Sequence, residues 1–313
     1  MGKYERAEIE AAFEDYRTRA QPDGQTDWAH WAELFTEDAL YVEHHLGRFE
    51  GRKAITDWIV SCMAEYPAMT TWIDWHQIEG DRVCFYVWNN LPDPTGEGRS
   101  FQFPNTTILT YGGDGQFSEQ HDYYNPADAT RVFTEWIQAG GRRNTPQDKS
   151  LQGVPGFQPP VPTPAHPREE VERELEVYRQ RGNTAVATGD WNQWADQFTD
   201  DAKYVEHHYG RFENQTEIRN WINGVMQPFP SMEFPIAWKS IEGNRVCTLI
   251  PNVLPDPKGG PDGYAFDVNT ILYYAGNGKW AYEEDVYNPK EAEQVVMAWV
   301  AAGGEIPGGV IPS

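Results

Sequence analysis

The chain carries two copies of one sequence, and this repeat constrains the fold more than any other feature. The stretch YVEHHLGRFE at Tyr41–Glu50 returns as YVEHHYGRFE at Tyr204–Glu213. A constant shift of 163 residues aligns positions 28–141 with the second half without a gap, and roughly half of these positions are identical. A duplication of this length predicts two similar domains rather than a solenoid of short repeats.

A proline-rich segment separates the two copies and contains the run GFQPPVPTPAHP. Proline lacks a backbone donor and favours extended geometry, so this composition predicts a semi-stiff spacer. We therefore expect a first domain at 1–143, a linker at 144–167, a second domain at 168–304 and a flexible tail at 305–313. Each expected domain is long enough to bury a core of its own.

The charge of the chain narrows the classes of partner. The formal net charge is −23 over 313 residues, and an acidic surface repels phosphate backbones and anionic lipid headgroups. We therefore expect no nucleic-acid partner and no membrane partner. The N-terminus shows no apolar signal segment, and Cys62, Cys84 and Cys247 do not form a disulfide framework, so we expect a cytoplasmic protein.

Hydrophobic periodicity gives the same order of elements in both copies. In the first copy it predicts helices at 9–20, 28–35, 52–63 and 127–141, and a strand at 38–47. Two hairpins follow from glycine turns, at 72–89 around Gly80 and at 101–125 around Gly113–Gly115. Asp27 and Asn125 are the expected N-caps of two of the helices. Helices followed by a run of antiparallel strands predict an α+β fold.

The pattern WA..F..DA.YVEHH.GRFE with a closing D.YNP resembles the SnoaL-like branch of the nuclear transport factor 2-like superfamily. The resemblance covers nearly the whole of each copy. It implies two cone-shaped, cystatin-like α+β barrels, each a curved antiparallel sheet wrapped on helices around an apolar pocket. Such domains pair through their sheets, so the resemblance also implies intrachain domain pairing as a pseudo-dimer, with a homo-oligomer as a further option. Members include polyketide cyclases, ketosteroid isomerases, dehydratases, an epoxide hydrolase and non-catalytic binding domains.

The Glu-His-His cluster of each copy is the main candidate for chemistry. In a regular strand alternate side chains share a face, so Glu43 and His45 are expected beside Tyr41, with His44 on the other face. Adjacent histidines in a strand cannot readily bind one metal ion, and the HxH and HExxH spacings are absent from the sequence. An acid/base role is therefore favoured over a metal site.

The resemblance gives roles to these residues. Glu43 and Glu206 fall where ketosteroid isomerases carry their general base, while the second acid of those isomerases is replaced by Thr107 and Thr270. The last strand offers a second acid or base, as in SnoaL-like cyclases, and the tyrosine before the cluster could stabilise developing negative charge. The expected catalytic residues are Tyr41, Glu43, His45 and Asp122 in the first copy, and Tyr204, Glu206, His208 and Asp285 in the second.

Two functions stay open at this point. The first is a general acid/base enzyme of isomerase, lyase or cyclase type, acting on a hydrophobic carbonyl-bearing small molecule. No nucleotide, flavin or metal motif occurs in the sequence, so we expect catalysis without a cofactor. The alternative is a non-catalytic ligand-binding or scaffold protein. A buried, uncompensated Glu43 in an apolar pocket favours the enzyme, and a Glu43–Arg48 pair in a filled interior favours the alternative.

Overall fold

The computed structural model describes residues 2–20, 26–144 and 166–307. The chain divides into two compact units, Met1–Gln158 and Pro159–Ser313, as the repeat predicts. Most of the expected linker at 144–167 and positions 308–313 of the expected tail lie outside the described residues, so the exact domain boundaries stay predictions. Among the described residues, no helix is both long and apolar enough to cross a membrane.

The first domain contains four helices and six strands among its described residues. The helices are α1 (Arg6–Ala20), α2 (Trp28–Ala32), α3 (Arg52–Ala64) and α4 (Pro126–Gln138). The strands are β1 (Phe35–Glu43), β2 (Gly47–Glu50), β3 (Thr70–Glu79), β4 (Arg82–Leu91), β5 (Phe101–Gly113) and β6 (Gln116–Tyr123). They form one sheet in the order β2-β1-β6-β5-β4-β3.

The second domain repeats this arrangement. Its helices are α5 (Arg168–Thr188), α6 (Asn192–Ala195), α7 (Gln215–Val225) and α8 (Pro289–Ala302). Its strands are β7 (Phe198–Glu206), β8 (Gly210–Phe212), β9 (Trp238–Glu242), β10 (Arg245–Leu254), β11 (Tyr264–Gly276) and β12 (Lys279–Val286). The sheet order is β8-β7-β12-β11-β10-β9, so both domains are α+β as predicted.

The sheets differ from the predicted antiparallel barrels in two ways. Strand β6 lies between β1 and β5 and runs parallel to β1, and β12 likewise runs parallel to β7. Each sheet is therefore mixed. Each is also open, because β2 and β3 are the edges of the first sheet and do not pair with each other. The long return of the chain from the β1–β2 hairpin to β6 produces the parallel pair, which local periodicity does not specify.

Local turn and cap predictions are confirmed. Gly80 lies between β3 and β4 with φ of 62°, a left-handed conformation that glycine adopts without steric cost. The β5–β6 hairpin turns at the predicted Gly113–Gly115 segment. Asp27 accepts hydrogen bonds from two backbone amides at the start of α2, and Asn125 accepts one from the Ala127 amide at the start of α4.

The predicted helix at 28–35 is wrong in its second half. Helix α2 ends at Ala32, and Phe35 begins β1, where its register partner is Phe117 of β6. Trp31 still packs on Phe35, with ring centroids 5.1 Å apart. The aromatic spacing therefore reports a shared core and not one continuous helix, because a helix-to-strand junction can bring the same rings together.

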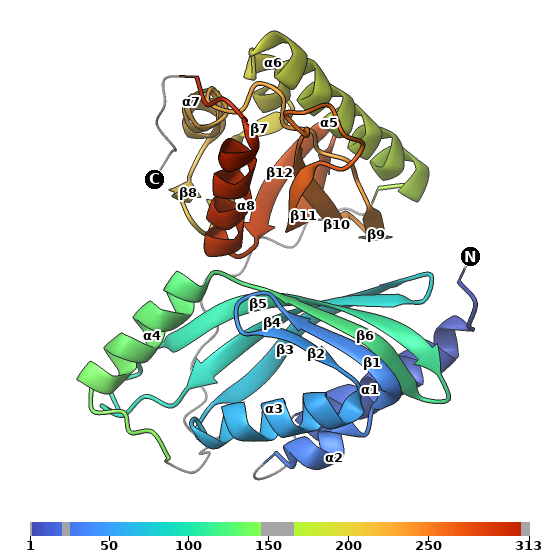
Figure 1. Ribbon diagram of the computed structural model, residues 1–313, viewed down its shortest axis with the longest axis vertical. Coiled ribbons are helices and arrows are strands. Elements are labelled where there is room, and N and C mark those ends of the chain that lie inside the picture. The colour runs from blue at the N-terminus through green and yellow to red at the C-terminus, as the bar shows by residue number, and fades with distance from the viewer. Residues whose placement is uncertain (1, 21–25, 145–165, 308–313) are drawn as a thin grey trace. The chain divides into compact units, whose positions relative to one another are not determined.

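Helices α1, α2 and α3 cover one face of the first sheet (Figure 1). Ile9, Phe13 and Tyr16 form the buried stripe of α1, and Phe13 packs against Phe85 of β4 with ring centroids 5.1 Å apart. Burial of such aromatic side chains stabilises each domain by several kcal/mol per ring, on the order of the ~3–5 kcal/mol lost when one is truncated to alanine. This face of the sheet carries the candidate site.

Candidate functional site

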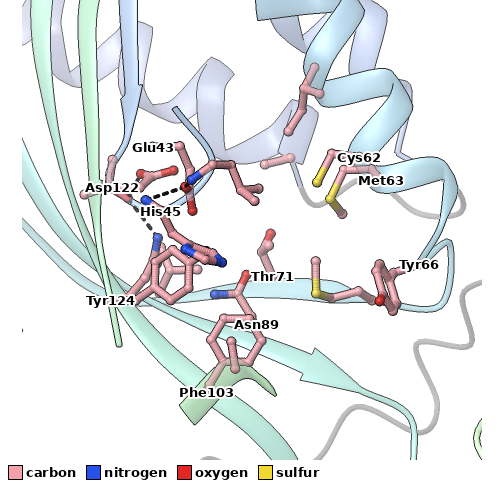
Figure 2. Close-up of a pocket in the computed structure, with 18 of the residues that line it drawn as sticks. Glu43, His45, Cys62, Met63, Tyr66, Thr71, Asn89, Phe103, Asp122 and Tyr124 are labelled. Atoms are coloured by element: carbon pink, nitrogen blue, oxygen red, sulfur yellow. Dashed lines mark hydrogen bonds between the residues drawn. The ribbon is translucent and has the colours of Figure 1, made fainter. Parts of the chain in front are cut away.

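A cavity of about 460 Å³ lies between the first sheet and its helices (Figure 2). Aromatic and aliphatic side chains make most of its wall, including Trp31, Trp58, Met63, Phe85 and Phe103. Polar side chains also reach it, among them Glu43, His45, Asn89, Asn105, Thr107, Gln120, Asp122 and Tyr124. An apolar wall with a few convergent polar groups is typical of a small-molecule site.

The structure brings Glu43 and Asp122 to neighbouring positions of this wall. Strand β1 ends at Glu43, and the parallel register pairs Glu43 with Asp122 of β6. Both side chains are buried, and Figure 2 shows both at the cavity. Two carboxyl groups so close repel each other when both are ionised, which raises the pKa of Glu43 beyond the effect of burial.

The expected strand position of His45 is wrong. Residues 44–46 form the turn between β1 and β2, so His45 is placed by the turn and not by strand alternation. Its side chain is exposed, lines the cavity and lies edge-on to Tyr124, with ring centroids 6.4 Å apart. The expected meeting of Glu43 and His45 at the cavity is still found, through a different backbone geometry.

The turn itself holds Glu43. The backbone amides of His45 and Leu46 both donate to Glu43 Oε2, the first at 2.8 Å, and the Tyr124 hydroxyl donates to the same carboxyl group. Burial raises the pKa of Glu43, and the Tyr124 hydrogen bond opposes this rise. Glu43 does not pair with Arg48, whose Nε lies 3.1 Å from Glu50 Oε1 on the surface.

Glu206 repeats this arrangement in the second domain. Its Oε2 accepts from the backbone amides of His208 at 2.7 Å and Tyr209 at 2.6 Å, and the Tyr287 hydroxyl donates to its carboxyl group. Burial raises the pKa of Glu206 to about 7. His208 is exposed in the equivalent turn. The carboxylate is thus poised to gain or lose a proton near neutral pH.

Asp122 is the acceptor of a buried network. Thr107 Oγ1 donates to Oδ1 at 2.6 Å, Gln120 Nε2 donates to the same oxygen at 3.0 Å, and the Tyr41 hydroxyl donates to Oδ2. Gln120 Nε2 also donates to the Tyr41 hydroxyl at 2.7 Å, and Gln120 Oε1 accepts from Tyr16 at 3.1 Å. Burial raises the pKa of Asp122, and these donors lower it.

The second domain has a network of the same outline with one change. Asp285 accepts from Thr270 and from the Tyr204 hydroxyl, both at 2.5 Å. Glu283 stands at the position of Gln120, is 1% exposed, and accepts from the Tyr178 hydroxyl at 2.6 Å. A fully buried acid therefore lies two residues from the half-buried Asp285 on the same face of β12.

Several members of these networks were not predicted from the sequence. Tyr16 and Tyr178 lie on the first helix of each domain, 104 and 105 residues from their partners Gln120 and Glu283. Their signal was present, because each tyrosine lies on the buried stripe of an amphipathic helix. The i, i+2 relation of Gln120 to Asp122 likewise predicts a shared face.

The other histidine of the cluster has different neighbours. The ring of His44 stacks on Tyr123, with centroids 4.4 Å apart, and its Nε2 lies 3.3 Å from His121 Nδ1. In the second domain His207 Nε2 lies 2.7 Å from Glu284 Oε1. Neither His44 nor His121 lines the cavity. Among the described residues, no group of three or more His, Cys, Asp or Glu side chains is arranged to hold a metal ion.

Comparison with known families accounts for both domains. A family model described as the SnoaL-like domain matches residues 10–120 and again residues 180–283, together more than half of the chain. The chain belongs to the SnoaL-like family. The predicted resemblance is thus confirmed for each copy separately. No curated protein sequence matches this SnoaL-like chain.

Solved structures resemble this SnoaL-like protein at low identity. A putative SnoaL-like polyketide cyclase from Jannaschia sp. CCS1 is 20% identical, with 42% of this chain and 96% of that chain covered and a TM-score of 0.34. An LEH-like epoxide hydrolase from M. tuberculosis is 16% identical, with 42% and 94% covered and a TM-score of 0.34. A hypothetical protein from Catenulispora acidiphila, with a ketosteroid isomerase-like fold and in complex with trimethylamine, is 23% identical, with 37% and 84% covered and a TM-score of 0.30. At these scores the likenesses carry no argument about the reaction.

Proposed function

We propose that this SnoaL-like protein is a cofactor-independent acid/base catalyst of isomerase, lyase or cyclase type. Its substrate is a hydrophobic small molecule that bears a carbonyl group. The observation that carries the proposal is the pair of buried carboxyl groups, Glu43 and Asp122, on the wall of one largely apolar cavity. Burial raises the pKa of both, toward the range in which a carboxylate is an effective general base.

Glu43 is the proposed general base. Two backbone amides and the Tyr124 hydroxyl fix its carboxylate, and a carboxylate with two oxygens has lone-pair capacity beyond three donors. A proton next to the substrate carbonyl passes to Glu43, which leaves an enolate. The enolate oxygen then takes a proton from His45 at the cavity or from the protonated form of Asp122.

Tyr41 receives a changed role in this proposal. Its one hydroxyl proton is already donated to Asp122, and its oxygen accepts from Gln120 at 2.7 Å. We therefore assign Tyr41 to holding Asp122 in position, in place of direct donation to the developing negative charge. Tyr204 makes the same bond to Asp285 in the second domain, where Glu206 and His208 are the proposed base and acid.

Proton exchange on enolisable hydrophobic ketones tests the proposal. The full chain is incubated with the ketone in deuterated water, and wild type is compared with Glu43→Gln, with Glu206→Gln and with the double variant. Each substitution removes one base while keeping the side-chain shape, so we expect the double variant to lose about 10²- to 10⁴-fold in exchange rate. Glu50→Gln, on the surface, is the matched control.

The same experiment can favour the alternative function. The hydrogen bonds from the turn amides to Glu43 also suit a non-catalytic ligand-binding protein, because they give the buried carboxylate a structural task. Ketone binding is the second readout, and it is measured through the quenching of fluorescence from cavity tryptophans such as Trp58. If wild type binds the ketone tightly but does not exchange its protons, the proposed enzyme function is wrong and the ligand-binding function takes its place.

A further inference from the structure

Among the described residues of the second domain, one buried carboxyl oxygen lacks a hydrogen-bond donor. Glu283 lies on β12 and is 1% exposed, and its Oε1 accepts from the Tyr178 hydroxyl at 2.6 Å. Its Oε2 is buried and accepts no hydrogen bond from the residues that the structure describes. An ionised carboxylate with an unsatisfied oxygen in such a place is strongly disfavoured, so the protonation state of Glu283 needs an explanation.

The first domain shows which atom this position requires. Gln120 is the register partner of Tyr41, as Glu283 is the register partner of Tyr204. Gln120 Oε1 accepts from the helix tyrosine, Tyr16, and Gln120 Nε2 donates to the Tyr41 hydroxyl at 2.7 Å. At this position, one terminal atom of the side chain accepts a hydrogen bond from the helix tyrosine. The other terminal atom donates a hydrogen bond to the strand tyrosine.

The same donor and acceptor roles explain the hydrogen bonding of Glu283 in the second domain. The Tyr204 hydroxyl has one proton and donates it to Asp285 at 2.5 Å, so it cannot also donate to the neighbouring Glu283. Glu283 Oε2 can pair with the Tyr204 oxygen only as a donor. We propose that Glu283 is a neutral carboxylic acid at neutral pH, whose Oε2–H donates to Tyr204 as the Gln120 amide donates to Tyr41.

The surroundings of Glu283 support this protonation state. The titratable groups that face it are Tyr178 from α5, Tyr204 from β7 and Asp285 on β12, while its register partner on β11 is the apolar Leu272. Burial raises the pKa of Glu283, and the negative charge of Asp285 raises it further. The Tyr178 hydroxyl, which donates to Glu283 Oε1, acts in the other direction and lowers this pKa.

A neutral acid at this position can do what an amide cannot. The Glu283 proton can move to the Tyr204 oxygen while the Tyr204 proton moves to Asp285 Oδ2. This shift leaves an ionised Glu283, an unchanged tyrosine and a protonated Asp285, so protons and charge balance. Glu283 is then a positioning residue that supplies Asp285 with a proton for a bound ligand. This relay rests on the proposed acid/base function, whereas the neutral state of Glu283 does not.

Infrared difference spectra test the neutral state directly. Wild type is compared with Glu283→Gln above pH 7, where Glu206, with a pKa of about 7, is ionised. We expect a protonated-carboxyl C=O band in wild type that Glu283→Gln removes, with an unchanged unfolding temperature or a higher one, because glutamine serves the same position in the first domain. The reciprocal Gln120→Glu variant should gain such a band. If Glu283→Gln loses no protonated-carboxyl band relative to wild type, the proposal is overturned.

Activity tests the relay separately. In a Glu43→Gln background, where proton exchange reports the second domain, adding Glu283→Gln should lower the rate at least ~10-fold and move the alkaline limb of the pH profile. An unchanged pH profile, or no proton exchange in that background, would contradict the relay. The neutral state of Glu283 would then be decided by the infrared spectra alone. No exchange in wild type would instead remove the proposed function, and the infrared result would still decide the protonation of Glu283.

Discussion

The two domains share a backbone plan and differ in the chemistry of one buried side chain. In both, a threonine of one strand faces an aspartate of the next, as Thr107 faces Asp122, and a tyrosine from the first strand donates to that aspartate. The difference is an amide at Gln120 against a carboxyl group at Glu283. A duplicated fold can therefore keep its hydrogen-bond geometry and change the number of dissociable protons in its site.

Removal of the aspartate gives the largest expected contrast between the domains. Asp122→Ala leaves three buried donors without an acceptor, and at ~1–3 kcal/mol for each unsatisfied group we expect a loss of about 3 kcal/mol or more. Asp285→Ala should cost less, because it leaves two donors, Thr270 and Tyr204, without their acceptor in place of three. Urea unfolding with hydrogen exchange resolved by domain measures both losses.

The exposed Asp57, which pairs with Lys53 on the surface of α3, provides the control for these losses. Its alanine variant should change the free energy of unfolding by less than about 1 kcal/mol. Equal losses for Asp122→Ala and Asp285→Ala would contradict the idea that the number of donors left without an acceptor sets the cost.

The pH dependence of stability gives the next contrast. The pKa of Glu283 is raised above its unfolded value of ~4.3, so folding favours the protonated acid. Its contribution is fully present below that unfolded value and is lost as pH rises toward the folded pKa, with a slope on the order of 1.4 kcal/mol per pH unit. Glu206, with a folded pKa of about 7, adds a similar slope only up to that pH.

Above pH 7 the free energies of unfolding of the two domains should therefore depend differently on pH. The second domain should keep losing stability in wild type, and Glu283→Gln should reduce that slope. Gln120→Glu should make the alkaline pH slope of the first domain steeper than in wild type. Domain-resolved unfolding at several alkaline pH values is the measurement, and a wild-type slope that Glu283→Gln leaves unchanged would contradict the assignment.

The smallest expected contrast concerns a thiol. Cys62 lines the first cavity, and Val225 occupies its position in the second domain. Burial is the main cause that raises the pKa of Cys62 to about 11, and the nearby charge of Glu43 contributes to the rise. At neutral pH its thiolate population should be about 10²-fold below that of an ordinary cysteine, so alkylation should be slow and should accelerate with pH.

Alkylation followed by mass spectrometry checks this prediction. Cys84 and Cys247 are fully buried and should stay unlabelled in the folded protein, and a ketone bound in the cavity should protect Cys62. Cys62→Val reproduces the second domain and should change stability by less than about 1.5 kcal/mol. Labelling of Cys62 at the rate of a free cysteine would show that the cavity wall is open to water there.

Local sequence signals predicted most of the elements and several residues that line the candidate cavity. The repeat predicted two domains, the glycine and asparagine positions predicted turns and caps, and alternation in β1 predicted that Tyr41 and Glu43 share a face. The helix at 28–35 failed because aromatic spacing fits a helix and a helix-to-strand junction equally well. The place of His45 failed because β1 ends at Glu43, where two turn amides satisfy the carboxylate.

The sequence alone determined the duplication, the α+β order of each half and the residue types available for acid/base chemistry, since these follow from short-range periodicity. Only the tertiary structure decided which of those residues meet. The parallel pairing of β1 with β6 sets Glu43 beside Asp122, and the docking of α1 brings Tyr16 to Gln120 across 104 residues of sequence. Such contacts depend on strand register and helix docking, which are set by the packing of the whole domain and not by any local stretch of the chain.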